Sequence, residues 1–177
     1  RTYGAMRGAK INFFPLLYLW RKVLKNVSFM TKEMYFTIAL LSYENGVICG
    51  HLHSPVLKKS IQFHNLTELI LIMDQIMQDF NIPEYDERYH HVIIKNQLLD
   101  VELDYQELKQ DNFEKYLNRS LMYPKKSKDI FMVKVMYRQN NTWQVKITWL
   151  RTNRVRFFRS ELELANLIYS VIDKYHK

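Results

Sequence analysis

The sequence predicts an α+β protein of two tandem β-β-β-α repeats, whose antiparallel sheets are each covered by a helix and packed pseudo-symmetrically. An N-terminal helix precedes them. The first observation is that Asn65-Leu-Thr-Glu68 and Ser160-Glu-Leu-Glu163, which lie 95 residues apart, both have the pattern of a helix N-cap with a capping box. The second is that apolar residues with helical spacing follow both motifs at matching positions. The third is that alternating apolar runs, separated by turn residues, precede both motifs and predict β-hairpins.

The first 29 residues form an N-terminal extension with one apolar run, Ile11 to Trp20. This run is about half the ~20 residues that a membrane span needs, and Arg21-Lys22 follow it without a small-residue cleavage site. We therefore predict neither a membrane span nor a signal peptide. Phe13 to Val27 is interpreted as an amphipathic helix that either docks on the domain or lies on a membrane surface.

The first repeat is assigned to residues 30–83 and the second to residues 130–177. In the first, a strand from Phe36 to Tyr43 runs into the turn Glu44-Asn45-Gly46, and a third strand is expected around Lys58 and Lys59. The strands expected in the second repeat are Phe131 to Tyr137, Trp143 to Trp149 and Val155 to Phe158. One unit of about 45 residues would bury too little surface to be stable, so we expect the copies to pack together.

Between the repeats, residues 84–129 form a connector that is first acidic and then basic. Residues 84–114 contain nine acidic side chains against three basic ones, although the whole chain has a formal net charge of +8. The connector is too apolar for a loose linker, and we expect a hairpin near 89–105 and a helix near 106–122.

The second repeat contains nine basic residues against three acidic ones. Strand alternation predicts that several bases share the sheet face opposite the helix, and one tryptophan could stack a base if it is exposed. These candidate nucleic-acid-binding residues are Lys134, Arg138, Trp143, Lys146, Arg154 and Arg156. We therefore predict a non-enzymatic protein that binds nucleic acid, preferably single-stranded DNA or RNA. An ordinary solvated basic face, with Trp143 in the core, is the alternative.

The corresponding face of the first repeat carries Thr37, Ala39, Leu41 and Tyr43. This composition favours a contact surface over a phosphate track. The alternative function is therefore a protein interaction or adaptor module that uses this face and the N-terminal helix, either with another protein or in a homodimer. The same helix could instead cover the face.

No catalytic, cofactor-binding or metal-binding residue is predicted. His51 and His53 could share a strand face, and His90-His91 is a second pair, but neither pair has a third ligand at a recognised spacing. Cys49, the single cysteine, is expected to be a small core residue, and one cysteine is compatible with a reducing cytoplasm. The four glycines do not form a phosphate loop.

Two resemblances add to these interpretations. The segments Met136 to Gln144, Ile147 to Trp149 and Phe158 to Leu164 resemble a signature of an uncharacterised family of short two-repeat proteins from gut Firmicutes. That resemblance implies a bacterial cytoplasmic protein and no particular activity. Tandem units of strands followed by one helix are similar to the PUR and whirly folds, which implies single-stranded nucleic-acid binding.

Overall fold

A computed structural model describes residues 32–84, 101–120, 127–139 and 142–175 of the chain. The helix predicted in residues 1–29 and most of the hairpin predicted near 89–105 lie outside these residues. The elements, in chain order, are β1 (Met34–Glu44), β2 (Val47–His53), β3 (Ile61–Phe63), α2 (Leu66–Phe80), α3 (Gln110–Ser120), β4 (Asp129–Gln139), β5 (Thr142–Trp149), β6 (Arg154–Phe158) and α4 (Glu161–Tyr175). Each half therefore has three strands followed by a helix. α3 lies within the range expected for a helix in the connector.

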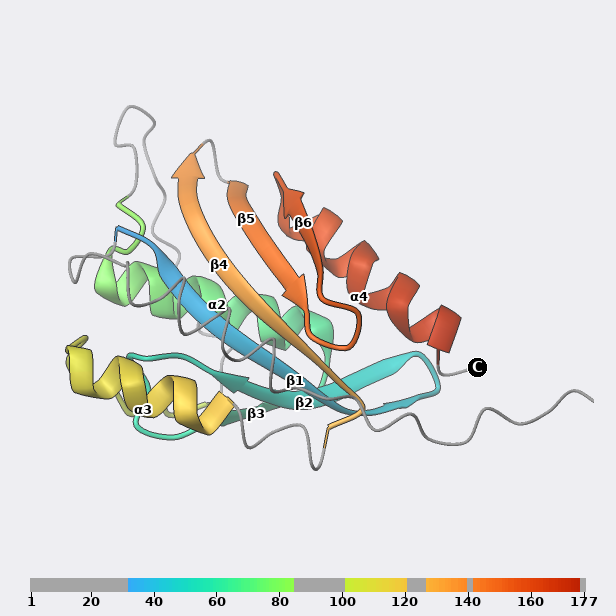
Figure 1. Cartoon of the computed structure of the whole chain (residues 1–177), viewed down its shortest axis with the longest axis horizontal. Coiled ribbons are helices and arrows are strands. Elements are labelled where there is room, and N and C mark those ends of the chain that lie inside the picture. Colours follow the sequence, from blue (N-terminus) through green and yellow to red (C-terminus); the bar gives the residue numbers. More distant parts are fainter. Residues whose placement is uncertain (1–31, 85–100, 121–126, 140–141, 176–177) are drawn as a thin grey trace, which may run out of the picture.

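All six strands form one antiparallel sheet in the order β3-β2-β1-β4-β5-β6 (Figure 1). The prediction of a separate sheet for each repeat is therefore wrong. β1 and β4 join the two halves, with a register that runs from Met34↔Val135 to Leu40↔Asp129. The physical reason is that both strands are largely buried, and an unpaired edge would leave their backbone N–H and C=O groups without partners.

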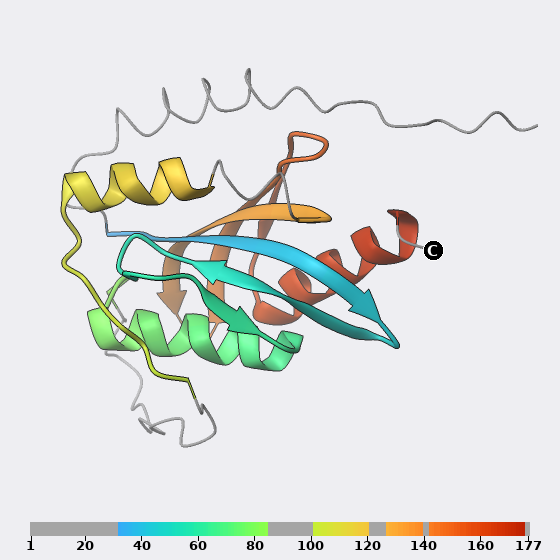
Figure 2. The ribbon, with the colours of Figure 1, turned by 90° about the horizontal axis from the view of Figure 1, so that it is seen from below.

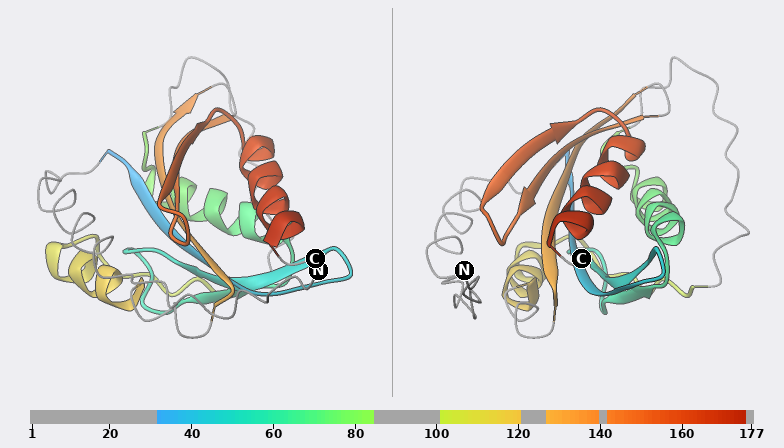
Figure 3. Two further views of the ribbon diagram at one scale, coloured as in Figure 1. Left: turned by 45° about the vertical axis from the view of Figure 1, so that its right-hand side comes forward. Right: turned by 90° about the vertical axis from the view of Figure 1, so that its right-hand side faces the viewer.

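α2 and α4 pack on one face of the sheet, and α3 lies on the opposite face (Figures 2 and 3). The main core fills the space between the sheet and the two helices α2 and α4. Most helix residues predicted to face it are buried, which confirms the apolar pattern: Leu69, Ile72, Met73, Ile76, Met77, Leu164, Ile168, Val171 and Ile172. Phe80 and Leu167, predicted on the same faces, are only partly buried. We call this side of the sheet the helix face and the other side the outer face.

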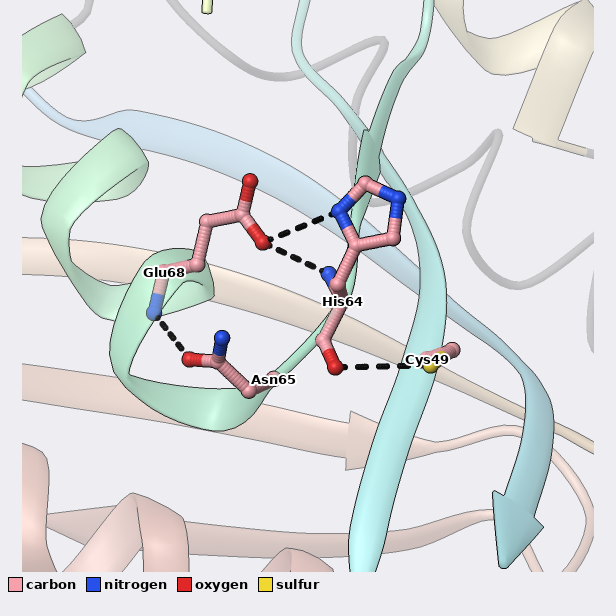
Figure 4. A network of polar contacts seen from close by, with 4 residues as sticks. All are labelled: Cys49, His64, Asn65 and Glu68. Atoms are coloured by element: carbon pink, nitrogen blue, oxygen red, sulfur yellow. Dashed lines mark hydrogen bonds and ion pairs between the residues drawn. The ribbon is translucent and has the colours of Figure 1, made fainter. Parts of the chain in front are cut away.

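Local signals in the sequence produce the expected helix starts. Asn65 Oδ1 accepts a hydrogen bond from the Glu68 backbone N–H at 2.8 Å, and the Glu68 carboxylate accepts one from the His64 N–H at 2.7 Å (Figure 4). At the start of α4, Ser160 Oγ accepts from the Glu163 N–H at 3.2 Å, and the Glu163 carboxylate again accepts a preceding backbone N–H. Both predicted N-caps are confirmed, and they satisfy backbone donors that the first turn of a helix cannot satisfy. The reciprocal bond of each predicted capping box is made to the residue before the N-cap, one position earlier than in a standard capping box.

The strand ends depend on turns and bulges. Asn45 and Gly46 connect β1 to β2 with φ angles of 52° and 80°, as expected for a tight hairpin turn. The register of β1 shifts between Leu40 and Ser42, and that of β4 shifts between Val135 and Tyr137. A β-bulge of this kind reverses the alternation of side chains beyond it. These two shifts determine which side chains reach each face.

Candidate nucleic-acid interface

The strand register places two of the predicted bases on the outer face. Phe131, Val133 and Val135 of β4 belong to the main core, so Lys134 between them points to the other side. Lys134 is directly opposite Lys146 of β5, and opposite residues of an antiparallel pair share a face. The prediction that Lys134 and Lys146 share the face opposite the helix of their repeat, α4, is therefore correct.

Arg138 does not lie on that face, so the prediction for this residue is wrong. It follows the bulge in β4, pairs with Trp143 and is only 6% exposed. Its Nε donates to the carbonyl oxygen of Pro83 at 2.8 Å, and its Nη2 donates to Asn81 Oδ1 at 3.2 Å. Asn81 is the left-handed C-cap of α2, so Arg138 fastens β4 to the end of that helix.

Trp143 and the two arginines of β6 also lie elsewhere than the sequence predicted. Trp143 is 4% exposed and belongs to the main core, so it is not exposed for base stacking. Arg156 pairs with Ile147, and Arg154 pairs with Trp149. Because these partners are core residues, both arginines lie on the helix-face side of the edge strand. Their side chains remain exposed there.

The two lysines of the outer face differ in their surroundings. Lys134 Nζ lies 2.7 Å from a carboxylate oxygen of Glu33 and 5.8 Å from the centroid of the Tyr35 ring. The same carboxylate accepts a hydrogen bond from the Tyr35 hydroxyl, and burial together with Glu33 raises the pKa of Tyr35. The charge of Lys134 is therefore compensated within the protein. Lys146 makes no ion pair with any of the described residues.

Sequence reasoning missed the exposed apolar residues of the outer face. Phe157 pairs with Lys146 and is 66% exposed, and Tyr137 pairs with Gln144 and is 56% exposed. Val155 of β6 is also exposed on this face, since it pairs with Thr148. We call Tyr137, Lys146, Val155 and Phe157 the outer-face cluster.

Two structural features explain why these residues were missed. The neighbours Phe157 and Phe158 cannot both point inward, and only the pairing of Val145 with Phe158 shows which one does. The bulge in β4 moves Tyr137 outward, and alternation alone gives no sign of it. Alternation does predict that one of the two phenylalanines of β6 must be exposed, which was the available signal.

The outer face of the first half is covered in part by α3. Thr37 Oγ1 lies 2.9 Å from Tyr116 Oη and 2.8 Å from Ser120 Oγ, and all three side chains are buried. Tyr43, which was expected on this face, packs instead against the main core, because it follows the bulge in β1. The contact surface expected around Thr37 is therefore occupied by a helix of the same chain.

The histidines and Cys49 form no metal site in the described part of the chain, where no group of three potential ligands occurs. Burial lowers the pKa of His51, and burial followed by the charge of Arg119 lowers the pKa of His53 to about 4. Cys49 is half-buried and donates to the His64 carbonyl at 3.4 Å, beside the capping box of α2 (Figure 4). His90 and His91 lie outside the described residues.

Comparison with known proteins does not assign the chain to a family. No protein-family model, curated protein or solved structure matches this chain. None of the helices in the described ranges is both long and apolar enough for a transmembrane segment.

Proposed function

We propose that the chain binds single-stranded nucleic acid on the outer face of β4, β5 and β6. Bases stack on Phe157 and Tyr137, and Lys146 neutralises a phosphate. The observation that carries the proposal is the 66% exposure of Phe157 directly opposite Lys146 on the outer face. Exposed aromatic rings beside cationic side chains are the usual means by which a sheet holds single strands.

The spacing of the two rings favours an extended, unstacked strand. Tyr137 and Phe157 lie on the strands that flank β5, opposite positions 144 and 146 of that strand. With about 4.8 Å between strands and about 3.4 Å per residue, their backbones are roughly 12 Å apart. Neighbouring bases of a stacked strand are separated by only ~3.4 Å. The bound strand is therefore splayed across the sheet, with the two rings contacting non-adjacent bases.

The number of lysines sets the expected salt dependence. Because Glu33 compensates the charge of Lys134, Lys146 is the one cation counted on the outer face, and the slope of log K against log salt is about −0.7 for a single strand. Affinity then falls about 2.6-fold between about 50 and about 200 mM salt. A platform containing all five bases predicted from the sequence would give a fall of about a hundredfold over the same range. The proposed interface is dominated by stacking.

The test is fluorescence anisotropy of labelled single-stranded and duplex oligonucleotides with the full chain and its variants. Phe157→Ala is expected to weaken single-strand binding by about 1–3 kcal/mol, or roughly 5- to 150-fold, and Lys146→Glu is expected to weaken it as well. Leu162→Ala on α4 is the matched control, because Leu162 is 69% exposed but lies outside the outer-face cluster. Equal affinities for Phe157→Ala and the unmodified chain would refute the proposal.

A protein interaction module is the second candidate. The observation that favours it is the apolar part of the outer-face cluster, Val155 and Phe157, next to a single lysine without an ion-pair partner among the described residues. In this case the outer face binds no oligonucleotide at low salt, and partner binding survives high salt.

We also propose that the two halves are copies of one ancestral unit. Both halves have the same order of elements, and their sheet bulges lie 95 positions apart, at Leu40/Ser42 and Val135/Tyr137. The capping boxes have the same offset. The resemblance to PUR and whirly folds, which also repeat strand-and-helix units, implies the ligand class proposed here.

A further inference from the structure

The strands at the two edges of the sheet differ in the exposure of their side chains. At one edge, only Gln62 of the three residues of β3 is exposed. Next to it, in the connection between β2 and β3, Leu57 forms an antiparallel bridge with Tyr105, and the Lys58 N–H donates to the Asp104 carbonyl at 3.0 Å. The segment before α3 therefore lies against this connection. At the opposite edge, β6 pairs with β5, and no other backbone hydrogen bond to β6 occurs in the described part of the chain. Four of the five residues of β6 are exposed.

The two faces of β6 carry different kinds of side chain, basic on one and apolar on the other. Arg154 and Arg156 lie on the helix-face side, whereas Val155 and Phe157 lie on the outer face. A strand added to this edge would thus meet cations on one side and apolar groups on the other. Side-chain pairs between neighbouring strands stabilise a sheet. A strand that alternates acidic and apolar residues would therefore pair favourably with β6.

The same pattern argues against a second copy of the chain at this edge. Two β6 strands related by a two-fold axis through Arg156 would bring this arginine opposite itself, and would pair Val155 with Phe157. Like charges directly opposite destabilise a strand pair. Positive charge on an edge strand is a usual protection against self-pairing.

The connection between β2 and β3 provides an internal example of an acidic, alternating segment that pairs with backbone of this chain. Val101, Leu103 and Tyr105 pack against the main core, whereas the alternate residues Glu102 and Asp104 are exposed. Asp104 also lies 2.7 Å from the Nζ of Lys58, beside the bridge. An acidic, alternating segment with an ion pair thus already pairs with backbone of this chain, at the connection between β2 and β3.

We propose that the β6 edge binds an extended acidic peptide as an added strand. Carboxylates of the peptide pair with Arg154 and Arg156, and its apolar residues cover Val155 and Phe157. Main-chain hydrogen bonds to β6 supply affinity, and the alternating side chains supply specificity. This binding surface shares Phe157 with the one proposed for nucleic acid, and it differs from it in using the main chain of β6 and its two arginines.

The first experiment measures binding of a labelled synthetic peptide with the sequence of residues 99–106 to the full chain by anisotropy. A control peptide carries Asn and Gln in place of Asp and Glu. The double variant Arg154→Glu, Arg156→Glu is expected to lose about tenfold or more of the affinity for the acidic peptide. The variant Lys59→Glu, Lys146→Glu makes the same change in net charge away from the edge, and we expect it to retain peptide binding.

A second measurement tests the added strand itself. Hydrogen exchange with and without the peptide is expected to show new amide protection in residues 154–158. Equal affinity for the acidic and neutral peptides, equal losses in the two double variants, or protection confined to other elements would each overturn the proposal. The Lys146 variant tests oligonucleotide binding, and the Arg154 and Arg156 variant tests peptide binding. Either proposal can therefore be refuted without the other.

Discussion

Replacing Arg138 tests whether this residue is a buried link between β4 and the end of α2, which we call the Arg138 clamp, or the surface phosphate contact that strand alternation predicts. Arg138→Met keeps most of the side-chain volume and removes the guanidinium. It abolishes the hydrogen bonds to the Pro83 carbonyl at 2.8 Å and to Asn81 Oδ1 at 3.2 Å. Hydrogen bonds that involve a charged group contribute about 1.5–3 kcal/mol, and the longer of these two contributes less. The cation also lies near the C-terminus of α2, where the helix dipole adds about 0.3–1 kcal/mol.

The expected loss of unfolding free energy is about 2–4 kcal/mol, because a carbonyl in a buried region is left without its donor. For a chain of this length, the midpoint of thermal unfolding falls by roughly 4–16 °C. Urea and thermal unfolding can be followed by tryptophan fluorescence, since Trp143 and Trp149 are both buried in the core. Lys146→Met is the matched control on the outer face, and its stability should change by less than about 0.5 kcal/mol.

If Arg138→Met unfolds at the same midpoint as the unmodified chain but loses oligonucleotide binding, Arg138 is a surface contact and the register beyond the bulge is wrong. If Arg138→Met and Lys146→Met are destabilised equally, the loss of unfolding free energy reflects a general effect of removing a charge and not the loss of the Arg138 clamp.

Two further predictions concern the first half of the chain. Folding lowers the pKa of His53 from 6.5 to about 4, so the unfolded chain binds a proton between these pH values that the folded chain does not. Stability therefore falls as the pH drops from 6.5 to about 4, by up to about 3 kcal/mol, and His53→Gln should remove most of this slope in urea titrations; His51 leaves a residual slope of the same sign. Gly50→Ala should destabilise the fold by about 1–3 kcal/mol, because its Cβ would lie 2.3 Å from the Ala39 carbonyl oxygen and 2.7 Å from the Phe63 ring. Unfolding midpoints of Gly50→Ala equal to those of the unmodified chain would contradict that contact.

Much of the local structure was predictable from the sequence. The helix starts at Asn65 and Ser160 follow from side chains that bond to backbone groups three residues away. The hairpin at Asn45-Gly46 follows from the tolerance of these residues for positive φ. The apolar stripes of α2 and α4 required only the helical period. In each case the deciding interactions lie within a few positions along the chain.

The candidate interface was much less predictable. Lys134 and Lys146 were placed on the correct face, because Lys134 precedes the register shift in β4 and Lys146 lies on the regular strand β5. Arg138 was misplaced because one extra residue in β4 reverses the alternation beyond it. The compensation of Lys134 by Glu33 depends on a side chain of β4 and one from the residue before β1, which only the fold brings together.

By itself, the sequence determined the α+β class, the sequence of strands and helices, and the apolar face of each helix, because these depend on short-range periodicity and capping. The tertiary structure decided that β1 pairs with β4 in one sheet, that α3 covers Thr37, and that Phe157 and Tyr137 are exposed. These outcomes depend on which backbone groups find partners across the sheet. The residues that form those pairs are far apart in the chain, so short-range sequence patterns do not predict them.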